Sequence, residues 1–276
     1  MFAKSIICVV GTRDADDDMR KACQLGLEMD AHLTVLVIGI APSPSVGDYP
    51  VGSVSVDRWQ AELAAVDRQA ARATEICERA GVRFDVTGLN VEKAWADDEI
   101  AERVRYCDLV VIGPGVLADE TLKQQTVAGT LFASERPVMV LPAQGQPTLK
   151  PRTVLLAWDS SREAARAAYD MRSLLAAAAS VSVTMVDPVA TWRGNGDEPG
   201  ADIAAYLVRQ GANVTVERLA SAGRPVSAVL AQHAGDIKAD LVVMGAYHHT
   251  RFRQRLLGGV TSSMLDMPVL PVLMSR

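Results

Sequence analysis

The sequence lacks the patterns that mark several common kinds of site and location. Its four cysteines (Cys8, Cys23, Cys77 and Cys107) lie in the first half and form no CxxC pair, which excludes a zinc knuckle and a thioredoxin-type site. No run of about 18 apolar residues occurs, so no membrane span is expected. The short apolar run near the N-terminus is followed by acids and is a poor match to a signal peptide. We therefore expect a cytoplasmic protein whose cysteines are reduced packing residues.

Positive charge is also scarce. The 276 residues carry 28 Lys and Arg against 33 Asp and Glu, which gives a formal charge of −5 and a pI of about 5.4. Without a basic excess, neither nucleic acid nor an anionic membrane is expected as a partner. A composition of 49% hydrophobic and 22% charged residues is typical of a globular protein, and the length suggests two domains.

Motifs of the common catalytic classes are missing too. The chain contains no GxxxxGK[S/T], no HExxH and no GxSxG. No nucleophile can be paired with a base from spacing, so we assign no catalytic residue and expect no enzyme. His248 and His249 are adjacent and diverge on regular structure, so no metal site is expected either.

Three segments of the first half recur in the same order in the second half. The first segment is a base followed by a hydroxyl residue and five apolar residues. The second is Asp-Leu-Val-Val-x-Gly, and the third is an expected strand that contains Pro-Val. The pairs are 4–10 with 152–158, 108–113 with 240–245, and 136–140 with 267–271. A duplication explains three ordered matches better than chance, and the polar segment 143–151 reads as the link. We expect a first domain over residues 1–145 and a second over 151–276.

Each copy alternates short apolar runs with helical patterns. The runs are rich in Val, Ile and Leu and do not alternate with polar residues, which is typical of strands covered on both faces. Residues 56–77 carry an apolar stripe at steps of three and four, and Ser160–Glu163 has capping-box spacing. The expected strands lie near 4–10, 33–39, 83–91, 108–113 and 138–142, then 153–158, 181–187, 213–220, 240–245 and 269–274.

This alternation predicts an α/β fold with right-handed crossovers. We expect two repeated, open, mostly parallel five-stranded sheets with helices on both faces, of the Rossmann-like type.

The candidate site lies behind the strands of the second copy, because ligands of open α/β sheets bind at the carboxyl ends of strands. Asp159 follows the first of these strands and Gly245 the fourth. Glycines let backbone amides approach a phosphate, and a helix that starts near Thr261 or Ser262 would direct its amide dipoles at the same anion. Three arginines add positive charge to this loop. The candidate ligand-binding residues are Asp159, Gly245, Gly258, Gly259, Val260 and Thr261, and the arginines are Arg251, Arg253 and Arg255.

Gly245, Gly258 and Thr261, behind the strand 240–244, resemble the C-terminal signature of the universal stress protein family, Gly-x2-Gly-x9-Gly-Ser/Thr. In nucleotide-binding members this signature wraps the phosphates of ATP. Asp159 lies where the family has an aspartate that contacts the nucleoside. The resemblance covers the whole chain as a tandem, two-domain member with an adenine nucleotide alpha hydrolase-like fold. It implies ATP or a related adenine nucleotide as a cofactor of the second domain.

Two positions depart from that signature. His248 stands at the second glycine, and Gly259 rather than Ser or Thr follows Gly258, although Thr261 keeps a hydroxyl nearby. A Cβ at residue 248 obstructs the backbone's approach to a phosphate if that position needs a positive φ.

The first copy departs further. Its first strand ends in Gly11-Thr-Arg13 without an aspartate, and Gly129-Thr130 is the only remnant of the final Gly-Ser/Thr. Through Lys150 it holds 15 bases and 22 acids, a net of −7, whereas the rest holds 13 and 11, a net of +2. The second copy is therefore the half that tolerates an anion.

Several features keep a structural alternative. The segment Gly113-x-Gly115-x-x-Ala118 resembles a dinucleotide fingerprint, but a structural turn fits its position better. Asp159 either contacts a ligand or only interacts with the N-terminus of a helix. The three arginines either bind an anion or form a solvated face.

The sequence thus predicts a stress-response regulator of the universal stress type that binds ATP or a related nucleotide in its second domain, without fast catalysis. The alternative, favoured by His248, is a stress-associated protein-interaction scaffold that binds no nucleotide. A weaker third reading is an enzyme of the related hydrolase-like group. The family resemblance implies that the two domains pair through their last strands, with a homodimer of the whole chain left open and protein partners unidentified.

Overall fold

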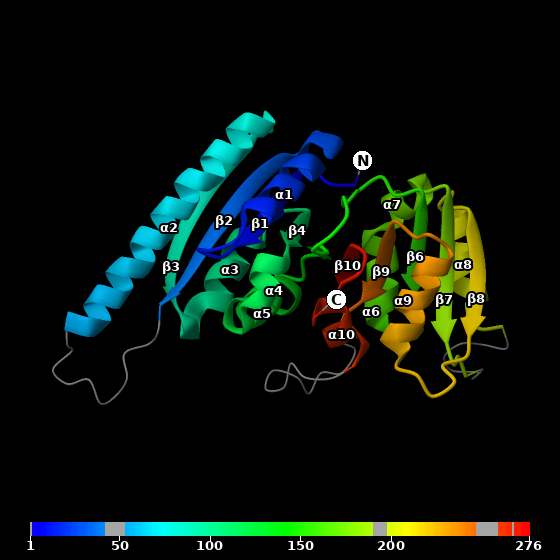
Figure 1. The fold of residues 1–276 in the computed structure, drawn as a ribbon. Coiled ribbons are helices and arrows are strands. Elements are labelled where there is room, and N and C mark those ends of the chain that lie inside the picture. The colour runs from blue at the N-terminus through cyan, green and yellow to red at the C-terminus, as the bar shows by residue number, and fades with distance from the viewer. Residues whose placement is uncertain (1, 42–52, 190–197, 247–258, 267) are drawn as a thin grey trace. The chain divides into compact units, whose positions relative to one another are not determined.

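The computed structural model describes residues 2–41, 53–189, 198–246, 259–266 and 268–276. The chain divides into two compact units, Ala3–Val138 and Met139–Arg276, the latter with the first two residues of the chain. We call these the first unit and the second unit. Each contributes a set of parallel strands with helices packed on both faces (Figure 1).

The strands of the first half follow the order β3-β2-β1-β4-β5. β1 pairs in parallel with β2 and β4, and β2 pairs in parallel with β3. β1 and β4 are the central strands, and nearly all their residues are buried, which explains their unbroken apolar sequences. The strands are β1 (Ser5–Val10), β2 (His32–Ala41), β3 (Phe84–Glu92), β4 (Leu109–Ile112) and β5 (Val138–Val140).

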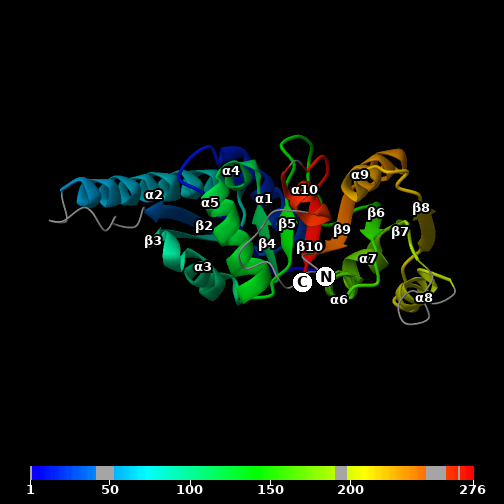
Figure 2. The ribbon, with the colours of Figure 1, turned by 90° about the horizontal axis from the view of Figure 1, so that it is seen from below.

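The helices of the first unit form two layers. α1 packs against α2, whereas α3 packs against α5 and η2. Figure 2 shows α2 and α3 on opposite sides of β2 and β3. Right-handed crossover connections that run first toward one edge of the sheet and then toward the other place helices on opposite faces. The helices are α1 (Asp16–Met29), α2 (Ser53–Ala80), η1 (Lys93–Trp95), α3 (Ala96–Val104), α4 (Pro114–Ala118), α5 (Glu120–Val127) and the π-helical η2 (Ala128–Ala133).

Helix α2 confirms the helix predicted over 56–77, but its stripe is only partly buried. Val66 fits where Gly39 and Gly88 lack side chains: a Cβ on either glycine would lie 2.7 Å from a Val66 methyl carbon. Towards the start of the helix, Trp59 and Leu63 remain 39% and 44% exposed. The part of α2 from Val66 onward therefore provides the packing against the sheet.

The second unit repeats the topology, with strand order β10-β9-β6-β7-β8 and parallel pairing throughout. In Figure 2, α9 and α10 lie on one side of these strands and α7 and α8 on the other. The strands are β6 (Thr153–Ala157), β7 (Ser180–Val186), β8 (Val214–Leu219), β9 (Leu241–Gly245) and β10 (Val272–Ser275). The helices are α6 (Arg162–Asp170), α7 (Arg172–Ala177), α8 (Ala201–Arg209), α9 (Val226–Asp236) and α10 (Val260–Asp266).

The predicted fold class, with open, mostly parallel sheets and helices on both faces, is confirmed, and each predicted strand has its counterpart. Two of the differences in boundaries have clear local causes. β10 begins at Val272 rather than near residue 269, because Pro271 has no N–H for the ladder and contributes only its carbonyl, which accepts from Val242 N at 3.0 Å. The capping box predicted at Ser160–Glu163 is wrong by one residue. Ser161 is the N-cap, and its Oγ accepts from Ala164 N at 3.0 Å.

Candidate functional site

The candidate site lies where the strand order of the second unit reverses. The chain runs from β6 outward through β7 and β8, then returns to β9 on the other side of β6. Ala157 pairs with Met244, so the residues that follow these two strands emerge side by side at the carboxyl edge. Such a switch point is the usual binding crevice of an open α/β sheet. It brings together the segments that begin at Asp159 and Gly245, as predicted from the sequence.

Asp159 shapes the turn between β6 and α6. Its Oδ1 accepts from Ser161 N at 2.9 Å, and Ser160 between them has a φ of 61°. This Asx turn delivers Ser161 to its position as the N-cap of α6. The side chain is exposed, and Oδ2 makes no hydrogen bond to the part of the chain that the structure describes. One oxygen of Asp159 is thus structural, and the other is available to a ligand donor.

Gly245 ends β9 directly beneath the first turn of α6. A Cβ at this position would lie 2.4 Å from Ala164 N and 2.5 Å from the carbonyl carbon of Glu163. The glycine is therefore required for close contact between helix and strand. This packing role accounts for Gly245 whether or not a ligand lies nearby.

Gly259, Val260 and Thr261 start α10, the helix that leads into β10. Gly259 has a φ of 99°, a conformation that favours glycine, and no atom of the described residues lies within 4 Å of a Cβ built on it. Thr261 is buried in the first turn of the helix. The helix begins at Val260, one residue before the predicted start. Gly258, His248 and the three arginines at 251, 253 and 255 lie outside the described residues.

At the corresponding place in the first unit lies a buried acidic side chain. Asp18 of α1 is 2% exposed, and its Oδ2 accepts from Gly115 N at 2.9 Å. A Cβ on Gly113, at the end of β4, would lie 2.2 Å from Asp18 Cγ. Burial raises the pKa of Asp18 to about 6, while the hydrogen bond from Gly115 acts in the opposite direction.

The sequence reading missed Asp18, although the helical period of α1 places it on the same buried face as Ala22 and Leu25. It sits at the third residue of α1, and Ala164 sits at the third residue of α6. In both units this third residue packs against the glycine that follows the fourth strand. A buried carboxylate in one unit thus corresponds to a methyl group in the other.

The Gly129-Thr130 pair is not the loop remnant that the sequence suggested. Both residues lie within η2, and a Cβ on Gly129 would lie 2.5 Å from the carbonyl oxygen of Asp97 in α3. Thr130 is fully buried and donates to Thr126 O at 2.6 Å. The pair serves close helix packing. Similarly, Gly113 and Gly115 flank the start of the short helix α4 rather than a dinucleotide loop.

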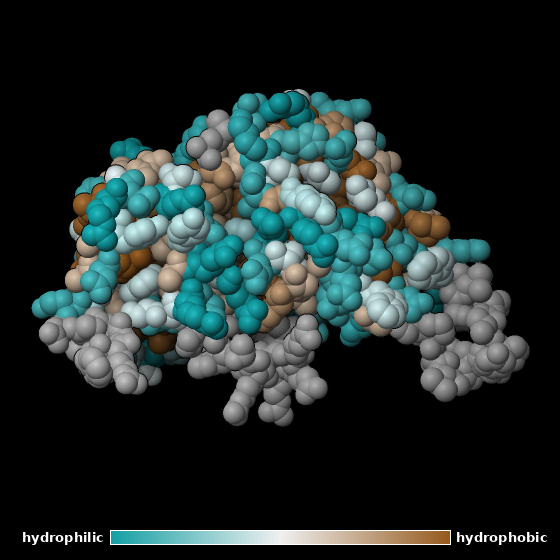
Figure 3. All heavy atoms as spheres, turned by 180° about the vertical axis from the view of Figure 1, so that it is seen from behind, coloured by the Kyte–Doolittle hydropathy of each residue, from teal (hydrophilic) through white to brown (hydrophobic). Residues whose placement is uncertain are grey.

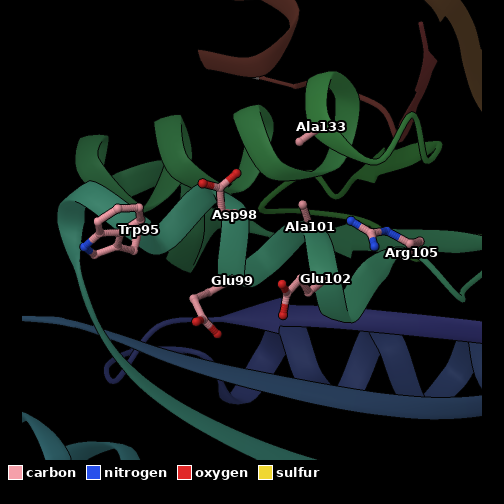
Figure 4. A pocket seen from close by; sticks show the side chains of 7 residues that line it. All are labelled: Trp95, Asp98, Glu99, Ala101, Glu102, Arg105 and Ala133. Carbon is pink, nitrogen blue, oxygen red and sulfur yellow. The ribbon is translucent and has the colours of Figure 1, made fainter.

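A separate hollow of about 420 Å³ lies on the first unit, along α3 (Figure 4). Its walls come from η1, α3 and the end of η2. Glu99 already forms an ion pair with Arg103 at 2.8 Å, and Glu102 lies 3.9 Å from the same guanidinium. The hollow lies outside the residues predicted to bind a ligand. Its lining residues are Trp95, Asp98, Glu99, Ala101, Glu102, Arg105 and Ala133.

The surface shows no large apolar area on the face drawn in Figure 3, where described hydrophobic residues form small patches among hydrophilic ones. Among the described residues, none of the helices is long and apolar enough to cross a membrane. The same part of the chain holds no cluster of three or more His, Cys, Asp or Glu suited to a metal ion.

Comparison with known proteins identifies the second half of the chain. Residues 150–276 match the family model described as the universal stress protein family. No curated protein matches the chain.

Solved structures extend the likeness in fold to both halves. A universal stress protein from Archaeoglobus fulgidus has a TM-score of 0.70 and 14% identity, and covers 98% of this chain and 96% of its own. A protein of unknown function from Pseudomonas aeruginosa has a TM-score of 0.50 and 18% identity, with 98% and 92% covered. A universal stress protein in complex with cAMP has a TM-score of 0.36 and 20% identity, with 46% and 98% covered. Residues 150–276 therefore form a universal stress protein domain, and the first half of the chain repeats its fold.

Proposed function

We propose that the second unit binds ATP or a related adenine nucleotide at the crevice between β6 and β9, and that the chain is a stress-response regulator without fast catalysis. The family model covers this unit, and the crevice has the topology that binds ligands in open α/β sheets. Asp159 Oδ2 accepts no hydrogen bond from the described residues, and a carboxylate oxygen at this crevice suits a hydroxyl donor of the nucleoside. Gly259, Val260 and Thr261 would lie near the phosphates at the start of α10, whereas Gly258 lies outside the described residues.

One observation carries the choice between the units, namely the residue against the glycine that ends the fourth strand. In the first unit it is Asp18, a buried acid that competes with a phosphate for the Gly115 amide and repels it. In the second unit it is Ala164, which has no charge. The net charges of −7 for residues 1–150 and +2 for residues 151–276 favour the second half in the same way. The first unit is then a structural or interaction domain.

Titration calorimetry of the full chain with ATP tests this proposal. We expect one nucleotide per chain, and Asp159→Ala should weaken binding by about 1–3 kcal/mol, the usual cost of leaving a polar group without its partner. Asp159→Asn keeps an Oδ1 acceptor for the turn, so it separates loss of charge from loss of the Asx turn. Arg13→Ala is the matched control, because Arg13 is exposed and precedes α1 by the spacing that places Asp159 before α6. Equal loss from the control would overturn the assignment.

The alternative is an interaction scaffold that binds no nucleotide, and the replacement of the second signature glycine by His248 favours it. Denaturing the purified protein and analysing the released material by absorbance and chromatography separates the two. Co-purified adenine nucleotide supports the binding proposal. A wild-type chain without affinity for ATP, rescued by His248→Gly, would establish the scaffold instead.

A further inference from the structure

Two buried thiols face each other between α1 and α2 in the first unit. Cys23 Sγ and Cys77 Sγ lie 3.6 Å apart, and both residues are at most 1% exposed. Cys23 belongs to the buried stripe of α1, and Cys77 to the part of α2 that packs against the sheet. The two helices thus present one thiol each to their shared interface.

The pair is unlike the other two cysteines of the chain. Cys107 donates its S–H to the carbonyl of Val104 at 3.2 Å, within its own turn. Cys8 lies in the central strand β1 and is fully buried. All four thiols are free. Among the described residues, only the sulfurs of Cys23 and Cys77 are in contact with each other.

The step from contact to bond is short. A disulfide places its sulfurs about 2.05 Å apart, so each sulfur must move by less than about 1 Å from the observed separation. We propose that Cys23 and Cys77 are a modification site, at which a small hydroperoxide oxidises the two thiols to an intramolecular disulfide that links α1 to α2.

The two thiols share one hydrogen bond, in which either sulfur can be the donor. One of them reacts first: its thiolate attacks one peroxide oxygen, the O–O bond breaks, the leaving oxyanion takes up the proton released by that thiol, and the thiol becomes a sulfenic acid. The sulfur of the other cysteine then attacks the sulfenic sulfur, the S–O bond breaks, and water leaves with the proton of the second thiol.

Burial sets the rate of this reaction. Neither sulfur is accessible in the closed structure, so peroxide reaches them only when α1 and α2 separate locally. The rate of thiol loss should rise with peroxide concentration at first and then become constant, because opening becomes the slow step. An exposed thiol would show no such plateau.

Thiol counting on the full-length protein tests the site. The protein is treated with hydrogen peroxide, denatured and alkylated, and its intact mass gives the number of free thiols. Peptide mapping after digestion without reductant shows which cysteines are linked. We expect the count of free thiols to fall from four to two, with a Cys23–Cys77 peptide pair. Cys8→Ser should behave as wild type does, whereas Cys23→Ser and Cys77→Ser should form no disulfide within the chain.

Three outcomes would overturn the proposal. They are four free thiols after prolonged treatment with peroxide or diamide, a disulfide that contains Cys8 or Cys107, and bridges only between chains. Linkage mapping of the wild-type protein gives the answer even if a serine variant fails to fold. Nucleotide binding by the second unit is independent of each of these outcomes.

Discussion

At the residue scale, the two halves of the chain differ in the residue packed against the glycine at the end of the fourth strand, which is Asp18 in the first half and Ala164 in the second. Asp18 is flanked by Asp16 and Asp17, which pair with Arg72 and Lys21 respectively, so the three acids look alike in sequence but not in structure. Hydrophobic periodicity could have placed Asp18 on the buried side of α1. Its partner could not have been found that way, because Gly115 lies 97 residues away and meets Asp18 only through the order of the strands.

Asp18 should make the stability of the first unit depend on pH. A carboxyl whose pKa is about 6 when folded, against an ordinary value of 3.8, binds its proton more tightly in the folded state. Its burial therefore does not lower the free energy of unfolding below about pH 4. The loss in the free energy of unfolding grows to about 3 kcal/mol as the pH rises through 6. Asp18→Asn keeps an oxygen acceptor for Gly115 N and removes the charge. We expect it to stabilise the protein at pH 7.5 and to lose that advantage near pH 4.

Denaturant unfolding of both proteins between pH 4 and 8 measures this effect. Asp98→Asn is the control, since Asp98 is an exposed acid and its substitution should change stability by less than about 0.5 kcal/mol at every pH. A pH-independent difference between Asp18→Asn and wild type would show that the carboxyl does not titrate in this range.

At the scale of elements, most of the architecture could be predicted, and the exceptions have local causes. Buried strands such as β1 and β4 are continuous apolar runs, which the sequence displays directly. The start of α6 was misplaced by one residue because Ser160 and Ser161 both suit an N-cap, and only the positive φ of Ser160 decides between them. The π-helical η2 has no sequence signal that could be distinguished from an ordinary helix.

The contact between α6 and β9 should tolerate no side chain at Gly245. Gly245→Ala places a Cβ against the backbone of Glu163 and Ala164, which cannot move aside as a flexible side chain can. We expect a loss of about 2 kcal/mol or more in the free energy of unfolding. Gly235→Ala is the matched control, because Gly235 lies in α9 with no atom within 4 Å of its Cβ position, and alanine favours a helix by about 1 kcal/mol. Equal stabilities of the two variants in urea unfolding would contradict the packing role.

On the scale of the whole molecule, the chain is one topology used twice with different crevices. The duplication and the five strands of each half were accessible from the repeated motifs, whereas the choice of the second half for the nucleotide stays a prediction. The sequence could not show that Asp18 lies against Gly113 in the first unit, because this contact depends on how α1 packs on the sheet.

Pairing of the two domains through their last strands, and pairing of whole chains, stay predictions. Light scattering coupled to size-exclusion chromatography measures the mass of the assembly and so tests the pairing of whole chains directly. A homodimer should give twice the 29.5 kDa of the chain, and the monomer mass at all concentrations would exclude it.

Photo-labelling with an azido-adenine nucleotide is the most direct test of the central claim that the second unit holds the nucleotide. After irradiation, digestion and mass spectrometry, the labelled peptides should fall within residues 151–276, and excess unlabelled ATP should abolish the label. Label in peptides of residues 3–138 that ATP displaces equally well would contradict the claim, as would no displaceable label in either unit.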